Sequence, residues 1–350
     1  MAMKYFDYES LNALVVTPAI VAKMNQIYEL RGQQQDGLQK SRVALERLVN
    51  IAKVESTDAS NRIEGVYTSD TRLRELVNKK TTPHNRSEAE ISGYRDVLEL
   101  IHEHYQDIPI TSNSILGLHK QLFNYTESIW GGHYKDINNT IVNHYKDGSQ
   151  GVRFTPPPAH MTPELVDSLC HAYNQAIHAG VLSPLLLTGA FVFDFVSIHP
   201  FRDGNGRMSR LLMLLTLYQN NFLVGKFVSI EQLIEHTKSA YYERLQQSST
   251  DWMTNGNSYA PFLDYFLSII LQAYRDLNER INITQPQAKS AAELVLNALQ
   301  RELRPLSKRD LLSLVPEYSQ RSIERALLEL QNKQQIEKIG RGRATRYRLV

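Results

Sequence analysis

The sequence predicts a mostly α-helical protein with one inserted β-hairpin and a small basic module in its last quarter. Three observations predict this class: apolar residues recur at helical spacing in most segments, one stretch breaks that spacing, and the charge changes sign near residue 285. The 350 residues are 42% hydrophobic and 22% charged. This is the composition of a globular chain long enough for two or three domains.

The helices are expected from the spacing of apolar side chains and from the residues that precede them. Apolar positions at helical spacing fill residues 10–55, where Pro18 is placed to start a helix. Further helical patterns, most of them preceded by Ser, Thr or Pro, cover residues 87–104, 112–125, 163–178, 184–198 and 259–283. Helices therefore account for most of the expected core.

The exception lies between residues 130 and 158. It is rich in β-branched and aromatic residues, carries the turn sequence Lys-Asp-Gly-Ser at 146–149, and ends in three prolines. The pattern predicts a β-hairpin inserted in the helical region. An exposed hairpin often binds a partner by strand addition. A hairpin that packs on the domain and binds no partner would show the same sequence pattern.

The segment after residue 285 has its own pattern and its own charge. It carries thirteen Lys and Arg against seven Asp and Glu, whereas residues 1–284 carry 26 against 30. Amphipathic segments at 290–302, 307–314 and 319–331 precede two strand-like runs joined by a Gly-Arg-Gly-Arg turn. This order resembles a winged helix, with Arg321 and Arg325 on its third helix and Arg341, Arg343, Arg346 and Arg348 on or beside the wing. Such a module binds DNA or contacts protein.

One polar loop between two apolar helical runs, residues 199–210 with the sequence HPFRDGNGRMSR, stands apart from the rest of the chain. Gly204 and Gly206 flank Asn205 and let the backbone approach a ligand closely. Successive N–H groups at a helix start form an anion site, which would accept a phosphate.

Four side chains of the same segment suit nucleotide chemistry. Arg207 and Arg210 are three residues apart and share a helix face that could meet outer phosphates. Asp203 offers the hard oxygen that Mg²⁺ prefers. His199 is the group able to take a proton near neutral pH.

Together these residues fit HxFx(D/E)GNGRxxR at every fixed position, and the segment therefore resembles the Fic family of nucleotide transferases. The resemblance implies a helical enzyme that moves AMP from ATP, with Mg²⁺, to a Ser, Thr or Tyr hydroxyl of a target protein. It implies that His199 is the general base and that Asp203 holds Mg²⁺. The Gly204-Asn205-Gly206 backbone and the Asn205 side chain would contact the α-phosphate, Arg207 the β-phosphate and Arg210 the γ-phosphate.

The inserted hairpin also has a counterpart in the family, a flap that pairs with the backbone of the target. By this resemblance Gly132-His133-Tyr134-Lys135 begins the flap, with Lys135 where many relatives have Arg. The pairing edge would consist of Ile141, Val142, Asn143, His144 and Tyr145.

A second segment, SNRIEG at residues 60–65, fits the family's inhibitory pattern (S/T)xxxE(G/N). The resemblance implies that Ser60, Glu64 and Gly65 belong to an N-terminal inhibitory helix, and that Glu64 forms a bidentate ion pair with Arg210 in place of the γ-phosphate. A plain helix end capped by Gly65 is the simpler interpretation, and both can hold at once.

The expected organisation is an N-terminal helical region at 1–85, a catalytic domain at 86–283 and a winged-helix-like domain at 287–350. The expected function is an autoinhibited AMP transferase. One alternative is a hydrolase that removes AMP, with Glu64 positioning water. Another is a DNA-binding regulator whose core senses nucleotide. A donor such as UTP, self-modification and a homodimer are all compatible with the sequence.

The cellular setting follows from what the sequence lacks. Its single cysteine, Cys170, excludes an intramolecular disulfide framework and indicates a reducing compartment. We expect a cytoplasmic protein without membrane contact, because no signal-like or membrane-spanning stretch is present. His102, His104, His119, His171 and His178 lack metal-ligand spacing, and we expect them to be structural or surface residues.

Overall fold

The computed structural model describes residues 4–9, 11, 15–38, 42–144, 150–284, 290–302, 304–316, 318–340, 342 and 345–350. The chain divides into two compact units, Met1–Glu279 and Arg280–Val350. The first unit contains both the N-terminal region and most of the catalytic region expected from the sequence, so the boundary at residue 85 stays a prediction. In the described parts of the chain, no helix is long and apolar enough to cross a membrane.

The first half of unit 1 is helical, and local sequence sets where its helices begin. Pro18 is the first residue of its helix, as predicted. Side chains of Ser69, Asn85 and Thr111 accept hydrogen bonds from N–H groups in the first turns of the last three helices of this half. These elements are α2 (Pro18–Leu38), α3 (Arg42–Ile63), α4 (Asp70–Asn78), α5 (Arg86–His104) and α6 (Ser112–Leu122).

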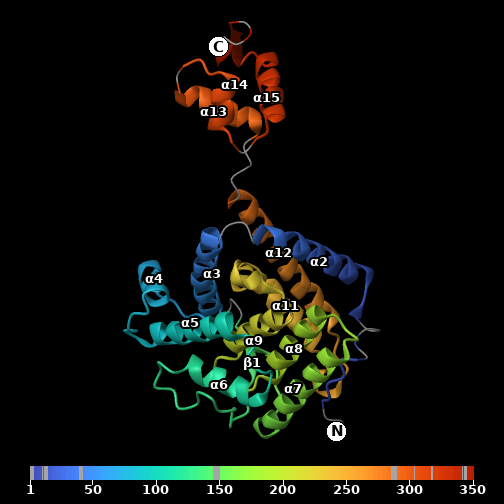
Figure 1. Ribbon diagram of the computed structural model, residues 1–350. Coiled ribbons are helices and arrows are strands. Elements are labelled where there is room, and N and C mark those ends of the chain that lie inside the picture. The colour runs from blue at the N-terminus through green and yellow to red at the C-terminus, as the bar shows by residue number, and fades with distance from the viewer. Residues whose placement is uncertain are drawn as a thin grey trace. The chain divides into compact units, whose positions relative to one another are not determined.

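The centre of unit 1 is a pair of helices, α8 (Pro184–Ile198) and α9 (Asn205–Gln219), which pack on each other. Nearly every residue of both helices is buried, so they form a core covered on all sides (Figure 1). Helix α7 (Thr162–Ala179) covers α8, and α5 and α3 contact α9. The polar loop at 199–204 therefore lies between two core helices.

A two-stranded antiparallel sheet confirms the predicted hairpin. Strand β1 (Ile141–His144) pairs with β2 (Gln150–Phe154), with Ile141 opposite Phe154 and Asn143 opposite Gly151. The register shifts after Ile141, which is a β-bulge. The turn predicted at 146–149 and Tyr145 lie outside the described residues.

Helices that the sequence analysis left unassigned complete unit 1. They are α10 (Ile230–His236), which packs on α3, and α11 (Lys238–Ser249), which contacts β2. The long helix α12 (Ala260–Thr284) follows, near the range predicted at 259–283. Short 3₁₀ turns lie at Ala159–Met161, Leu223–Lys226 and Trp252–Thr254.

Unit 2 has its own apolar core, which includes Val295, Leu311, Ile323 and Tyr347. A residue of the first loop, Leu306, forms a bridge with Tyr347 and so adds a third short strand position to the hairpin. Its elements are α13 (Ala291–Glu302), α14 (Lys308–Leu314), α15 (Gln320–Asn332), β3 (Ile336–Ile339) and β4 (Arg346–Leu349). Arg341 and Arg343, predicted on the wing, lie outside the described residues.

Candidate functional site

The loop between α8 and α9 is closed by its own residues. The Asn205 side chain accepts a hydrogen bond from the Phe201 N–H at 2.9 Å and donates one to the Phe201 carbonyl at 2.8 Å. Gly204 adopts a left-handed φ of 81°, where a Cβ would come within 2.9 Å of the Phe123 ring. The loop thus reaches the first turn of α9 in one defined conformation.

The Asn205 side chain also has a structural role that the sequence analysis did not predict. Both polar atoms of its amide are occupied by Phe201, and the side chain is buried. The first role of Asn205 is to hold the loop. The phosphate contact expected of this side chain stays a prediction, while its N–H lies at the start of a 15-residue helix, where an anion is favoured.

His199 ends α8 in a left-handed conformation, with φ 50° and ψ 61°. Its N–H donates to the Phe195 carbonyl at 3.1 Å. Burial lowers the pKa of the His199 imidazole to about 4, and the positive charge of Lys135 acts in the same direction. The ring is therefore neutral near pH 7 and has a lone pair available for a proton.

A second histidine supports the loop from α6. The His119 ring stacks on Phe201 with a centroid separation of 3.6 Å. The Gly132 N–H donates to His119 Nδ1 at 2.9 Å, so the proton of the neutral ring is on Nε2, which lies 3.1 Å from the Asp203 carbonyl. Burial lowers the pKa of His119 to about 4, which keeps this tautomer neutral. The expectation that His119 is structural is thus confirmed.

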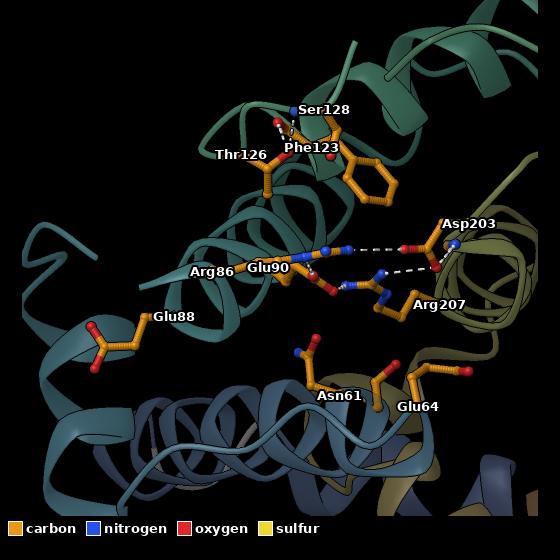
Figure 2. A network of polar contacts seen from close by, with 12 residues as sticks. Asn61, Glu64, Arg86, Glu88, Glu90, Phe123, Thr126, Ser128, Asp203 and Arg207 are labelled. Atoms are coloured by element: carbon orange, nitrogen blue, oxygen red, sulfur yellow. Dashed lines mark hydrogen bonds and ion pairs between the residues drawn. The ribbon is translucent and has the colours of Figure 1, made fainter. Parts of the chain in front are cut away.

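Asp203 and Arg207 face two charged residues of α5, as Figure 2 shows. Arg207, which is 1% exposed, donates to Glu90 Oε2 at 2.8 Å, and its Nη2 lies 3.5 Å from Asp203 Oδ1. Arg86 Nε donates to Glu90 Oε1 at 2.9 Å, and its Nη2 lies 4.0 Å from Asp203 Oδ2. Glu90 thus fixes Arg207 from α5, while the Asp203 side chain stays 43% exposed.

Arg210, one turn further along α9, meets the end of α3. Its Nε donates to Ser60 Oγ at 2.8 Å, and its Nη2 donates to the Ser60 carbonyl at 2.9 Å and to Glu64 Oε1 at 2.7 Å. The predicted pair of Glu64 and Arg210 is present, but it is a single hydrogen bond rather than the expected bidentate contact. Ser60 accepts from Nε and from the second Nη2 hydrogen, so Nη2 divides its two donors between Ser60 and Glu64.

The electrostatics of this pair favour its charged form. Burial by itself would raise the pKa of Glu64, but the adjacent Arg210 guanidinium outweighs it and holds that pKa below its usual value. Arg207 and Lys238 act in the same direction as Arg210. Glu64 is therefore a carboxylate at neutral pH.

The same segment is also a regular helix end. Gly65 has a left-handed φ of 81°; its N–H donates to the Arg62 carbonyl, and the Val66 N–H donates to the Asn61 carbonyl. These two bonds form a Schellman motif. Lys238 caps the Ile63 carbonyl at 2.6 Å. Residues 60–65 are thus both a capped helix end and the segment that pairs with Arg210. The two are compatible because the helix ends just after Glu64.

Gly206 explains how these groups come so close. A Cβ built there would lie 2.1 Å from Glu64 Oε1 and 3.2 Å from Arg210 Nη1. Glycine therefore allows the Glu64 carboxylate to lie directly against the first turn of α9, beside the Arg210 guanidinium.

A pocket opens beside this space and joins the predicted site residues to the hairpin. His199, Gly206, Arg210 and Glu64 line it together with Ile141. The flap thus lies against the motif, although the side chains of Val142, Asn143 and His144 are outside the described part of the chain. The remaining wall comes from β2, α8 and α11: Arg153, Phe154, Val196, Ser197, Tyr241, Tyr242, Leu245, Gln246 and Ser249.

Several residues of the site were missed by sequence reasoning. Glu90 and Tyr241 come from distant segments and belong to no short motif, so their helical pattern was their only signal. The same holds for Glu231, a fully buried carboxylate on α10 that accepts hydrogen bonds from Ser56 and Tyr94 at 2.7 and 2.9 Å. This carboxylate connects α3 to the core one turn before Ser60.

Comparison with known proteins agrees with this geometry. A model of the Fic/DOC family matches residues 109–217, the range from just before α6 to the end of α9. A "Protein adenylyltransferase Fic" of Drosophila willistoni is 26% identical over 198 residues, 54% of this chain. The match spans about a third (35%) of the length of that relative.

Solved structures share the fold. A Fic family protein from Desulfovibrio desulfuricans superimposes with a TM-score of 0.63 at 22% identity, covering 96% of this chain and 97% of the other. A Fic domain-containing protein from Bacteroides thetaiotaomicron superimposes with a TM-score of 0.61 at 23% identity, covering 73% of this chain and 97% of the other.

A Fido domain-containing protein of Dictyostelium discoideum is 38% identical over 98 residues, which are 25% of this chain and 68% of that protein. With this degree of identity over most of a relative, the chain belongs to the Fic/DOC family.

Proposed function

We propose that this protein transfers AMP from ATP to a hydroxyl side chain of a target protein. The observation that carries the proposal is the convergence of a neutral His199, the first turn of α9 and the cation Arg210 around one pocket, with a second cation, Arg207, on the same helix. Relatives named "Protein adenylyltransferase Fic" at 24–27% identity support the same reaction.

The residues present fit ATP and Mg²⁺. The N–H groups of the first turn of α9 suit a phosphate, and Gly206 already lets one anion, the Glu64 carboxylate, lie against that turn. Asp203 is the half-exposed carboxylate beside it, and Mg²⁺ commonly binds through one or two carboxylates plus phosphate oxygens. When bound there, Mg²⁺ would supply charge neutralisation on the phosphates.

The reaction assigned to the chain's own groups is a proton transfer coupled to a displacement. His199 accepts the proton of the target hydroxyl, the hydroxyl oxygen forms a bond to the α-phosphorus, and the bond to the β-phosphate oxygen breaks, so that pyrophosphate leaves. Arg207 and Arg210 stabilise the charge on the departing phosphates. The negative phosphates beside the ring raise the pKa of His199 toward the working pH, which favours a general base.

Regulation of this reaction is assigned to the end of α3. Glu64 occupies the guanidinium that the γ-phosphate would need, so a productive ATP pose requires the carboxylate to leave Arg210. A de-AMPylating hydrolase, in which the ionised Glu64 positions water, is the competing assignment. The two differ in whether removing Glu64 raises AMP transfer or abolishes AMP release from modified protein.

The hairpin and unit 2 are assigned to partners. The β1 segment, which pairs with β2, would add a strand of the target on its other edge. Unit 2 has the helix and strand order of a winged helix, and Arg309, Arg321 and Arg325 are exposed on it. Exposed arginines on the third helix favour contact with DNA phosphates. Self-modification, a homodimer and a cytoplasmic location are further expectations of this assignment.

The test uses the purified chain, labelled ATP, Mg²⁺ and a cell lysate, in a Glu64→Gly background that removes the inhibitory carboxylate. We expect labelled protein from Glu64→Gly and none from Glu64→Gly combined with His199→Ala. His171→Ala is the matched control, because His171 is exposed on α7 and should leave labelling unchanged. Undiminished labelling without His199 would contradict the mechanism.

A further inference from the structure

Lys135 is a buried lysine that forms hydrogen bonds with the residues on both sides of His199, an arrangement called here the clamp. Its backbone N–H donates to the Pro200 carbonyl at 2.8 Å. Its Nζ donates to the Ile198 carbonyl at 3.2 Å and to Asn139 Oδ1 at 3.1 Å. One residue, 3% exposed, thus fixes both carbonyls that flank His199 in the sequence.

Such a clamp matters because of the backbone conformation of His199. His199 has a left-handed φ of 50°, and a residue other than glycine is strained there and keeps this conformation only where its surroundings determine it. The Ile198 carbonyl is one of the last four of α8, which have no partner inside the helix. A cation at this helix end satisfies that carbonyl and is favoured by the helix dipole.

Lys135 also brings charge to the ring. Among the described residues, no carboxylate forms an ion pair with its Nζ, and burial lowers the pKa of Lys135 to about 8. Three charged groups act on His199 from the surrounding segments: Lys135 and Arg153 lower the pKa of the imidazole, and Glu64 raises it. Lys135 is the larger influence of these two cations on the pKa of His199, and it also donates hydrogen bonds to the residues on either side.

We propose that Lys135 is the positioning residue of His199, holding the ring in place through both neighbouring carbonyls. The proposal rests on the proposed function for its catalytic meaning, but its geometry concerns the chain alone. Lys135 touches neither the hydroxyl nor the phosphate in this assignment. It acts through His199.

The test compares Lys135→Met, Lys135→Gln and Lys135→Arg in the full chain carrying Glu64→Gly. The first readout is the NMR titration of the His199 ring, with the signal identified by its loss in His199→Ala. We expect Lys135→Met and Lys135→Gln to move the pKa of His199 upward, toward 6.5, and Lys135→Arg to keep it low.

The second readout is the pH profile of AMP transfer. Lys135→Met should lower kcat by about a hundredfold, the usual effect of a misplaced reacting group, and change KM for ATP much less. Lys135→Gln keeps a hydrogen-bond donor but loses the charge, so it should retain a higher kcat than Lys135→Met. The acid limb of its pH profile should move to higher pH. Lys135→Arg should restore both the kcat and the pH profile of the protein that has Lys135.

The matched control is Lys226→Met. Lys226 is also partly buried, has a pKa lowered by burial, and donates to a carbonyl of α5, that of His102, at 2.6 Å. Its replacement removes a comparable bond and charge and should leave the His199 titration unchanged.

The outcomes separate this inference from the proposed function. A shifted His199 pKa in Lys135→Met, without AMP transfer by any variant, would support the clamp and reject the transferase. Active Lys135→Met and Lys135→Gln proteins with an unshifted His199 pKa would overturn the clamp and leave the transferase standing.

Discussion

At the scale of single residues, Arg210 shows how one guanidinium can serve two neighbours on α3. Two of its three hydrogen bonds go to Ser60 and one goes to Glu64. The bonds to Ser60 involve a hydroxyl and a carbonyl, which carry no net charge. Glu64 therefore provides the charge balance and Ser60 the orientation.

This division leads to a prediction for Glu64→Gly. The variant frees Arg210 for a phosphate, and we expect AMP transfer to rise by roughly ten- to a thousandfold, since losing one partner of a buried pair is commonly worth a few kcal/mol. The measurement is labelled AMP incorporation by the wild type, by both single variants and by the double variant. Arg210→Ala should not be activated, because it lacks the phosphate ligand. Equal, low transfer in wild type and Glu64→Gly would leave residues 60–65 as a plain helix end.

At the scale of elements, α3 is held against the core by a second contact besides Arg210. Glu231 on α10 accepts hydrogen bonds from Ser56 on α3, from Tyr94 on α5 and, at 3.4 Å, from Ser229. A buried carboxylate that relies on hydroxyl donors is costly to leave with fewer of them. Two buried polar contacts one turn apart, at Ser56 and at Ser60, thus add to the packing that holds the proposed inhibitory helix.

We predict that Ser56→Ala loosens this helix. Removing one donor from a buried carboxylate should lower the free energy of unfolding by about 1–3 kcal/mol and raise basal AMP transfer above wild type. Thr57→Val is the matched control, because the Thr57 hydroxyl is buried without a hydrogen-bond partner among the described residues and its loss breaks no bond. Urea unfolding and labelled AMP incorporation check both variants. Indistinguishable Ser56→Ala and Thr57→Val proteins would contradict the anchor.

The helices and loops also show which parts of the structure could be predicted from the sequence. Residues 199–210 are contiguous, so their chemistry is visible in the sequence, and Pro18 marks the start of α2 by its fixed φ. Glu90 and Glu231 acquire their roles only when α5 and α10 pack on α9 and α3, which no local pattern encodes. The pairing of Asn205 with Phe201 depends on loop geometry, so it could not be predicted from the sequence.

At the scale of the whole molecule, buried histidines should make stability depend on pH. Burial lowers the folded-state pKa of His102 to about 3 and that of His119 to about 4, against 6.5 for the ordinary group. Below pH 6.5 these two histidines bind protons in the unfolded chain but stay neutral in the folded chain. The free energy of unfolding therefore falls as the pH drops toward about 4.

Urea midpoints measured between about pH 7 and about pH 4.5 should therefore decrease, and His102→Gln should make the decrease shallower. His104→Gln is the control, since the His104 side chain is 57% exposed and should leave the slope as in wild type. An unchanged slope in His102→Gln would show that this histidine takes up its proton in the folded state.

The two units allow a second prediction at this scale. Deleting residues 285–350 should leave ATP binding intact, because every motif residue lies in unit 1. Retention on DNA, and its decrease with added salt, should be lost with the deletion. If the full chain is not retained on DNA even at low salt, unit 2 is to be assigned to protein contact.

The bonds between Arg210 and Ser60 have a consequence for how fast the proposed switch can respond. Because Ser60 holds the guanidinium by two bonds that do not involve Glu64, withdrawal of the carboxylate leaves the arginine already aligned. An incoming phosphate then meets a donor that has no rotamers to search and little entropy left to lose. Activation would exchange one anion for another at a stationary receptor, and the nucleotide would do the moving.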